Sequence, residues 1–118
     1  MFGFLKSGPT LSPVDAVSMV KKGTLQLIDI RDISEVKTSG IAKGATHIPL
    51  MMVNVKADPR HPEFDETLDP SKPTAVYCAS GARSFIAVRQ LKKLGYEDVH
   101  NLGGLGHWQQ AGGKIIPA

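Results

Sequence analysis

The segment 74–83 constrains the fold more than any other part of this chain. Its first five residues, TAVYC, are rich in β-branched and aromatic side chains, which is typical of a buried strand. A short loop with one glycine follows, and from Arg83 apolar residues recur at helical spacing until Gly95 ends the pattern. A strand that leads through a tight loop into a helix predicts a crossover connection between parallel strands.

Other segments continue this alternation of strands and helices. Further strands are predicted over residues 25–30 (LQLIDI), 45–48 and 98–102 (DVHNL). Helices are predicted between Ser12, as N-cap, and Gly23, over the segment 50–55, and over 105–111. The pattern predicts an α/β fold with a mainly parallel sheet covered by helices.

Two stretches lack a clear period. Residues 31–50 are expected to be irregular, apart from the strand at 45–48 and one helical turn at 33–37. Residues 58–73 are rich in Pro, Asp and Glu, and we expect them to form a surface connection with a helical turn at 62–68.

Length and composition limit the class of protein. A chain of 118 residues predicts one domain over 11–118, preceded by an N-terminal tail at 1–10 that is too short for a membrane span or secretory leader. One cysteine cannot form an internal disulfide, which favours the cytoplasm. The basic residues behind the net charge of +3 are scattered, so neither nucleic acid nor a membrane is expected as a partner.

The single cysteine, Cys78, ends the predicted strand at 74–78. Ligands bind beyond the carboxyl ends of strands in an open parallel sheet, and a helix N-terminus there favours anions and thiolates. Gly81 can adopt a positive φ that turns backbone N–H groups inward, and Arg83 adds a permanent charge before Ser84. These residues predict a nucleophilic thiolate in an anion cradle, the alternative being an inert buried cysteine.

Four ordered segments carry a resemblance to a known family. They are LIDIRDISE (27–35), GIAKGATHIP (40–49), CASGARS (78–84) and LGGLGHWQQAG (102–112). Together they resemble the rhodanese (thiosulfate sulfurtransferase) family, particularly its small single-domain members, over roughly residues 11–117. The resemblance implies a rhodanese-like α/β fold in which helices flank the parallel sheet on both faces.

The resemblance also implies a mechanism and a set of site residues. Cys78 is the catalytic nucleophile that takes sulfur from a small anionic donor and passes it, as a persulfide, to cyanide, a thiol or a protein acceptor. The donor and the persulfide bind at the loop and helix start, which comprise Ala79, Ser80, Gly81, Ala82, Arg83 and Ser84. Asp29, Arg31 and Glu35 support the loop, with a salt bridge expected between Arg31 and Glu35. No metal or organic cofactor is implied.

Two alternatives remain from the sequence. A rhodanese module that binds a partner protein, either without catalysis or as a sulfur carrier, uses the same fold. A cysteine phosphatase is less compatible, because that class has a longer loop between its nucleophile and its arginine than the four residues 79–82 found here. Ala79 stands where several thiosulfate-using relatives carry a basic residue, which leaves Arg83 as the one charged side chain of the loop.

Overall fold

A computed structural model of the chain describes residues 11–118, and the predicted tail at 1–10 lies outside the described residues. The helical elements are α1 (Pro13–Lys22), α2 (Ile33–Ser39), the short 3-10 helix η1 (Leu50–Met52), α3 (Val53–Lys56), α4 (Ala82–Lys93) and α5 (Leu105–Gln110). The strands are β2 (Gln26–Asp29), β3 (Ile41–Ala42), β4 (Ala45–His47), β5 (Thr74–Cys78), β6 (Val99–Gly104) and β7 (Ile115–Ile116). The four strands predicted from the sequence are therefore confirmed.

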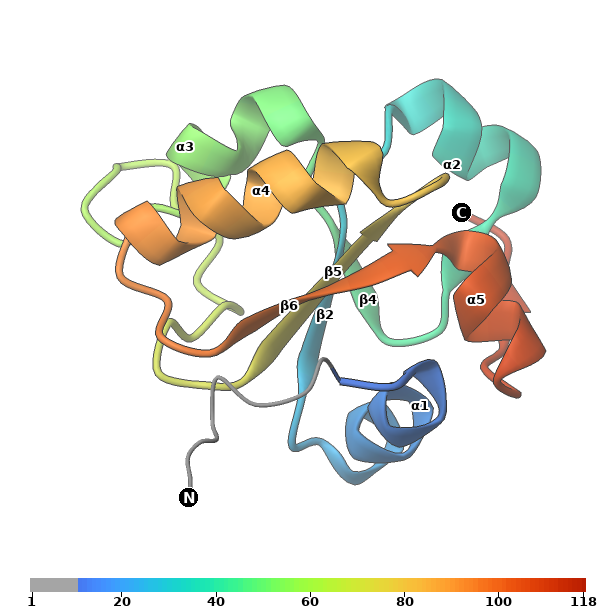
Figure 1. Cartoon of the computed structure of the whole chain (residues 1–118). Helices are drawn as coiled ribbons and strands as arrows, with labels where there is room; N and C mark the ends of the chain where they lie inside the picture. Colours follow the sequence, from blue (N-terminus) through green and yellow to red (C-terminus); the bar gives the residue numbers. More distant parts are fainter. Residues whose placement is uncertain (1–10) are drawn as a thin grey trace, which may run out of the picture.

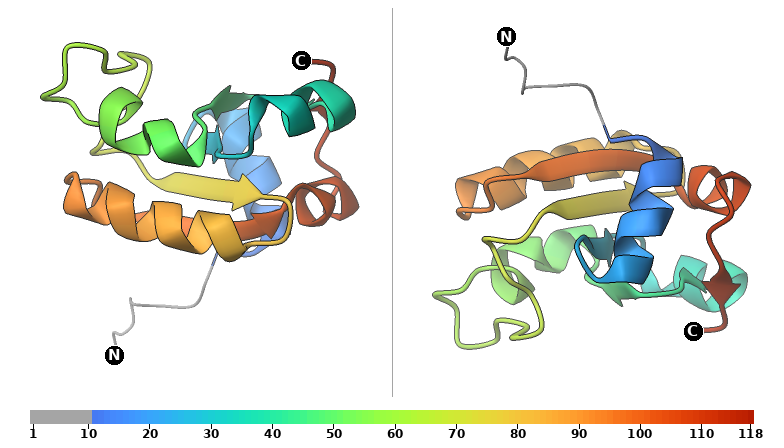
Figure 2. Two further views of the ribbon diagram at one scale, coloured as in Figure 1. Left: turned by 90° about the horizontal axis from the view of Figure 1, so that it is seen from above. Right: turned by 90° about the horizontal axis from the view of Figure 1, so that it is seen from below.

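The central sheet has the strand order β4-β2-β5-β6, and every neighbouring pair in it is parallel. In Figure 1 the helices α2, α3 and α4 lie above this sheet, α1 lies below it, and α5 lies beyond the end of β6, where its buried residues join the cluster on the α1 side. The two further views in Figure 2 show the same division. The predicted α/β fold, with a parallel sheet flanked by helices on both faces, is confirmed.

Alternating side chains of the strands supply two hydrophobic clusters, one on each face of the sheet. Ile28, Val76 and Cys78 point into the cluster under α3 and α4. Leu27 and Tyr77, their neighbours in sequence, point into the cluster under α1 and α5, which also contains Trp108. All five residues of β5 are buried, because this central strand is covered on both faces. The cysteine and the tryptophan therefore lie on opposite sides of the sheet.

Local signals set the limits of α1. The hydroxyl of Ser12 accepts a hydrogen bond from the backbone N–H of Asp15 at 3.1 Å, and Pro13 occupies the first turn. Gly23 ends the helix in the left-handed region, with φ of 77°. Both ends agree with the prediction.

The connection at 58–73 differs from the prediction, because it contains turns and no helical turn at 62–68. Three aspartates, at positions 58, 65 and 69, each accept a hydrogen bond from the backbone N–H two residues further on. Such Asx turns compete with a helix for the same backbone donors. The buried side chain of Leu68 anchors the segment to the core.

A second, two-stranded sheet was not predicted. β3 and β7 pair antiparallel, with Ile41 opposite Ile116 and Ala42 opposite Ile115. Two-residue strands that lie more than 70 positions apart leave no periodic signal in the sequence.

Within residues 11–118, each helix is too short or too polar to cross a membrane.

Candidate active site

Cys78 is the last residue of β5, at the carboxyl end of the parallel sheet. Residues 79–81 form a short loop, and α4 begins directly after it at Ala82. Gly81 makes this tight connection, because its φ of 108° lies in the left-handed region that side chains disfavour. The predicted order of strand end, glycine turn and helix start is therefore confirmed as geometry.

The sulfur of Cys78 is surrounded by hydrogen-bond donors. The backbone N–H of Gly81 donates to Sγ at 2.9 Å, and Oγ of Ser84 lies 3.5 Å from Sγ. Burial raises the pKa of the thiol, but hydrogen bonds from the Ser84 side chain and from the backbone N–H groups of Ser84, Gly81 and Ser80 lower it more. The pKa of Cys78 is consequently about 7 instead of 9.0. The nucleophilic thiolate therefore forms near neutral pH.

Asn101, a residue that sequence analysis missed, holds this arrangement together. Its amide Nδ2 donates to the carbonyl oxygen of Gly81 at 2.9 Å, and its Oδ1 accepts from the Ser84 hydroxyl at 2.6 Å. Ser84 has a single hydroxyl proton, so it donates to one of three acceptors: Oδ1 of Asn101, the carbonyl oxygen of Gly81 at 3.1 Å, or the sulfur. When Cys78 is neutral its S–H can donate to Ser84, and when Cys78 ionises the hydroxyl can turn to the thiolate.

We predict that Ser84→Ala moves the pKa of Cys78 upward from about 7, toward its ordinary value of 9.0, because the side-chain donor to the thiolate is lost. Thiolate absorbance followed against pH measures this directly, since the chain has one cysteine. Ser80→Ala is the matched control, because its backbone N–H is retained and its exposed hydroxyl makes no hydrogen bond within residues 11–118. An unchanged midpoint in Ser84→Ala would show that the backbone N–H groups alone set the pKa.

Two adjacent glycines at the end of β6 let the loop lie close to the sheet. A Cβ atom on Gly104 would stand 2.2 Å from the carbonyl oxygen of Ala79, and Gly81 packs against the Cα of Gly103. A side chain at position 104 would therefore displace the loop. The glycine pair was visible in the sequence, but nothing there showed that it faces the loop after a different strand.

The charged side chains pair differently from the expectation. Arg83 forms a two-pronged ion pair with Glu35 on α2, with distances of 2.6 and 2.9 Å. The guanidinium donates to the Glu35 carboxylate and holds the pKa of that carboxyl at about 2. The expected salt bridge between Arg31 and Glu35 is wrong, because Arg31 turns to Asp29 and Glu35 reaches across to α4.

Asp29 and Arg31 form a buried pair at the end of β2. Arg31 donates to the Asp29 carboxylate at 2.8 Å and to the carbonyl oxygen of Gly40 and the hydroxyl of Ser39, both at 2.6 Å. The hydroxyl of Tyr77 also donates to Asp29, at 2.6 Å. Tyr77, which lies beside the nucleophile in the chain, thus joins the buried pair, and the support of the loop by Asp29 and Arg31 stays a prediction.

An open hollow of about 340 Å³ lies beside the loop, lined by Arg31, Ser34, Glu35, Thr38, Ser39 and Ala79. Ala79 and Ser80 are exposed, whereas Cys78 is fully buried behind them. A small molecule therefore reaches Sγ only when part of the loop moves aside. The structure brings Ser80, Gly81 and Ser84 to the sulfur. Ala79 and Ala82 lie in the same loop and helix start, and Arg83 faces Glu35.

Comparison with known proteins adds independent information. A family model described as a rhodanese-like domain matches residues 12–111. Thiosulfate sulfurtransferase GlpE of Actinobacillus succinogenes is 30% identical over 103 residues, which cover 86% of this chain and 85% of that protein. The Bacillus subtilis protein named "Putative sulfur carrier protein YrkF" is 35% identical over 79 residues, which cover 67% of this chain and only 38% of that longer protein.

A solved structure from Rhodopseudomonas palustris is also similar, with a TM-score of 0.77 and 33% identity. The similarity covers 93% of this chain and 86% of that one, which is described as a protein of unknown function and possible tyrosine phosphatase.

Proposed function

The chain belongs to the rhodanese-like sulfurtransferase family, and on this premise we propose that it transfers sulfane sulfur through a persulfide on Cys78. The main supporting observation is the surroundings of the sulfur, where the Gly81 N–H and the Ser84 hydroxyl stabilise a thiolate at neutral pH. The proposal takes residues 11–118 as one domain, because both hydrophobic clusters share one sheet.

In the first step, the Cys78 thiolate attacks the outer sulfur of thiosulfate or of a persulfide or polysulfide. A new S–S bond forms on Cys78 and the old S–S bond breaks. The leaving group, which is sulfite, a thiolate or a polysulfide shortened by one sulfur, takes the bonding electron pair. The negative charge then rests on the terminal sulfur of the persulfide. The N–H groups that stabilise the thiolate, those of Ser80, Gly81 and Ser84, are suitable donors to this second anion.

In the second step, the acceptor attacks the terminal sulfur and the Cys78 thiolate leaves. With cyanide the product is thiocyanate, and with a thiol it is a new persulfide. The chain has no second cysteine to take the sulfur internally, so the acceptor is a separate molecule. We propose the reducing cytoplasm as the place of action, because an oxidising compartment would consume the single thiol.

The ion pair between Arg83 and Glu35 determines how charged a donor the site accepts. Its net charge is zero, so the hollow beside the loop lacks the free cation that a dianion such as thiosulfate prefers. We propose that Arg83 acts on the donor through its charge, in balance with Glu35. A donor with no net charge, such as cysteamine persulfide, should be insensitive to this balance.

We predict opposite effects for Arg83→Ala and Glu35→Gln. Arg83→Ala leaves a bare carboxylate and lowers kcat/KM for thiosulfate, whereas Glu35→Gln frees the guanidinium and raises it. Each change should be roughly three- to tenfold, since one unit charge near a surface contributes about 1 kcal/mol to an anion. The double variant restores a net charge of zero and should lie between them. Equal losses for thiosulfate and cysteamine persulfide in all three variants would mean that the pair holds the loop and not the donor.

Intact-protein mass spectrometry tests the proposed function. Incubation with thiosulfate should add the mass of one sulfur atom, and cyanide should remove it as thiocyanate appears. If thiosulfate adds no sulfur, the same measurement is made with cysteamine persulfide and with inorganic polysulfide. Added sulfur from either would show that Cys78 forms a persulfide with a donor other than thiosulfate. No added sulfur from any of the three would reject the sulfurtransferase proposal.

A sulfur carrier is the second candidate, and the burial of Cys78 favours it. A sulfur shielded from small molecules is released most readily to a partner that opens the loop. A persulfide that forms but resists cyanide and free thiols would identify a carrier. Hydrolysis of p-nitrophenyl phosphate that depends on Cys78 would instead indicate a phosphatase, the description given to the Rhodopseudomonas protein.

A further inference from the structure

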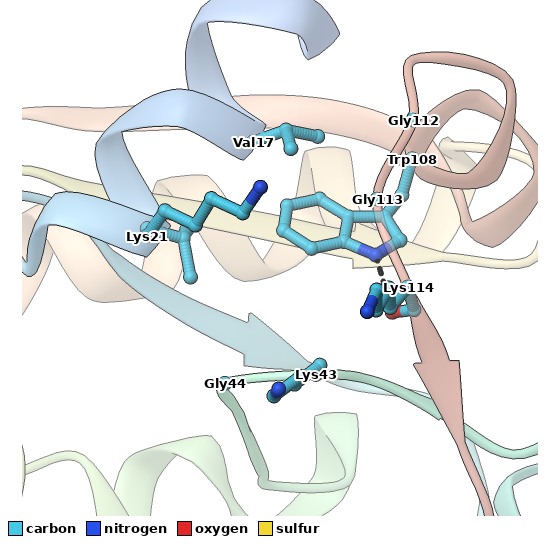
Figure 3. Close-up of a pocket in the computed structure, with 9 residues that line it drawn as sticks. Val17, Lys21, Lys43, Gly44, Trp108, Gly112, Gly113 and Lys114 are labelled. Atoms are coloured by element: carbon cyan, nitrogen blue, oxygen red, sulfur yellow. Dashed lines mark hydrogen bonds between the residues drawn. The ribbon is translucent and has the colours of Figure 1, made fainter.

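A cavity of about 350 Å³ lies on the face of the sheet opposite to Cys78. It is enclosed by α1, the turn before β4, and the segment between α5 and β7 (Figure 3). Its volume lies at the lower end of the range for pockets that hold small organic ligands. The proposed sulfur transfer uses none of its lining residues.

One side of this cavity is apolar and aromatic. The indole of Trp108 lies beside Val17 and Val20 of α1, which also line it. Nε1 of Trp108 donates to the carbonyl oxygen of Lys114 at 2.8 Å, so the polar atom of the ring is already paired. Trp108 is only 2% exposed, so the ring offers a small carbon surface at the base of the cavity.

Two glycines let the backbone walls of the cavity lie tightly against Trp108 and Val20, where a side chain would not fit. A Cβ atom on Gly113 would stand 2.3 Å from Cε2 of Trp108, and one on Gly44 would stand 2.9 Å from Cγ1 of Val20. The backbone N–H of Lys43 donates to the carbonyl oxygen of Lys114 at 2.8 Å, which joins the two walls. The cavity is thus bounded by backbone that is already fixed by hydrogen bonds.

Three lysines surround the opening. Lys21 comes from α1, Lys43 from the turn before β4, and Lys114 from the segment before β7. Figure 3 shows Lys21 extending from α1 toward the indole, with Lys43 and Lys114 on the other side of the cavity. Among residues 11–118, no carboxylate forms an ion pair with any of the three, although other lysines and arginines of the chain are paired. Three uncompensated cations beside an aromatic wall are complementary to an anion.

We propose that this cavity binds a small organic anion that carries a ring, such as an aromatic carboxylate, sulfonate or phosphate monoester. The ring of the ligand packs on Val17 and Val20 and reaches Trp108 at the base of the cavity, and the anionic group lies between the lysines. The ring supplies apolar contact area and the lysines supply charge, so both parts of the ligand are required. This site is separate from the persulfide site, because the sheet lies between them.

Trp108 is the only tryptophan of the chain, so its fluorescence reports on the cavity directly. We expect phenyl phosphate to change this fluorescence saturably, with an affinity at least about tenfold higher than that of inorganic phosphate or of benzyl alcohol. Saturation transfer to the ring protons of phenyl phosphate gives a second readout. Added salt should weaken the binding, since part of it is electrostatic.

Lys43→Ala and Lys114→Ala should each lower the affinity for phenyl phosphate about three- to fivefold. Lys22→Ala is the matched control, because Lys22 follows Lys21 on α1 and does not line the cavity. No response in either readout would overturn the proposal, as would an equal affinity for inorganic phosphate. The same loss in Lys22→Ala would also overturn it, by showing that net charge alone attracts the probe. Persulfide formation on Cys78, measured in parallel, keeps this result separate from the sulfurtransferase proposal.

Discussion

We expect Cys78→Ser to abolish sulfur transfer. The rate of transfer should fall more than about 10³-fold, and no persulfide should be detectable by mass. A serine hydroxyl is not ionised at neutral pH and does not form the S–S bond on which both steps depend. Because the chain has no other cysteine, no second thiol can substitute for it. The assays are thiocyanate release from thiosulfate and cyanide, and intact mass after incubation with each donor.

The fold of this variant should be preserved. A serine oxygen can accept the hydrogen bond that Gly81 donates to the sulfur, and Asn101 continues to hold the carbonyl of Gly81. We therefore expect a change in the free energy of unfolding of no more than about 1–2 kcal/mol. Full residual activity in a folded variant would show that Cys78 does not carry the sulfur. If the variant loses both its fold and its activity, mass spectrometry of the wild-type protein decides whether Cys78 carries the sulfur.

Features of the site that depend on neighbours in the sequence were predictable. The strand that ends at Cys78, the positive φ of Gly81 and the helix that begins at Ala82 all follow from a few consecutive residues. The cap at Ser12 and the end of α1 at Gly23 are local in the same sense. In each case, one residue's conformational preference decides the geometry.

Contacts between distant segments were not predictable in the same way. Asn101 reaches the loop because β6 lies beside β5, with an irregularity in the register between Val76 and Tyr77. In the sequence, the only indication that Asn101 reaches the loop was its position as a polar residue near the end of a predicted strand, which is a weak signal. Glu35 and Arg83 meet only after α2 and α4 have packed on the same face of the sheet.

The error over Arg31 has a physical cause. The bridge to Glu35 was expected along with the family resemblance, and the two residues do lie on either side of the start of α2. Burial decided otherwise, because Arg31 is only 3% exposed and needs acceptors on several sides. Asp29, Ser39 and Gly40 supply those acceptors.

Asp29→Ala should be the most destabilising substitution among these residues, with a loss of about 3–5 kcal/mol in the free energy of unfolding. It leaves the buried guanidinium of Arg31 without its counter-ion and the hydroxyl of Tyr77 without its acceptor. The pair sits at the end of β2, and Arg31 lines the same hollow as Ala79. Urea unfolding followed by Trp108 fluorescence measures the loss.

The chain contains a matched control for this argument. Asp58 and Arg60 have the same two-residue spacing, and the Asp58 carboxylate likewise accepts from the backbone N–H and Nε of its arginine, at 3.0 and 3.1 Å. Arg60 is 79% exposed, whereas the side chain of Arg31 is 3% exposed. Asp58→Ala should therefore destabilise the fold far less than Asp29→Ala, because water replaces the lost partner. Similar costs for the two variants would mean that the local hydrogen-bonded turn, and not the burial of an unpaired charge, explains the stability that Asp29 contributes.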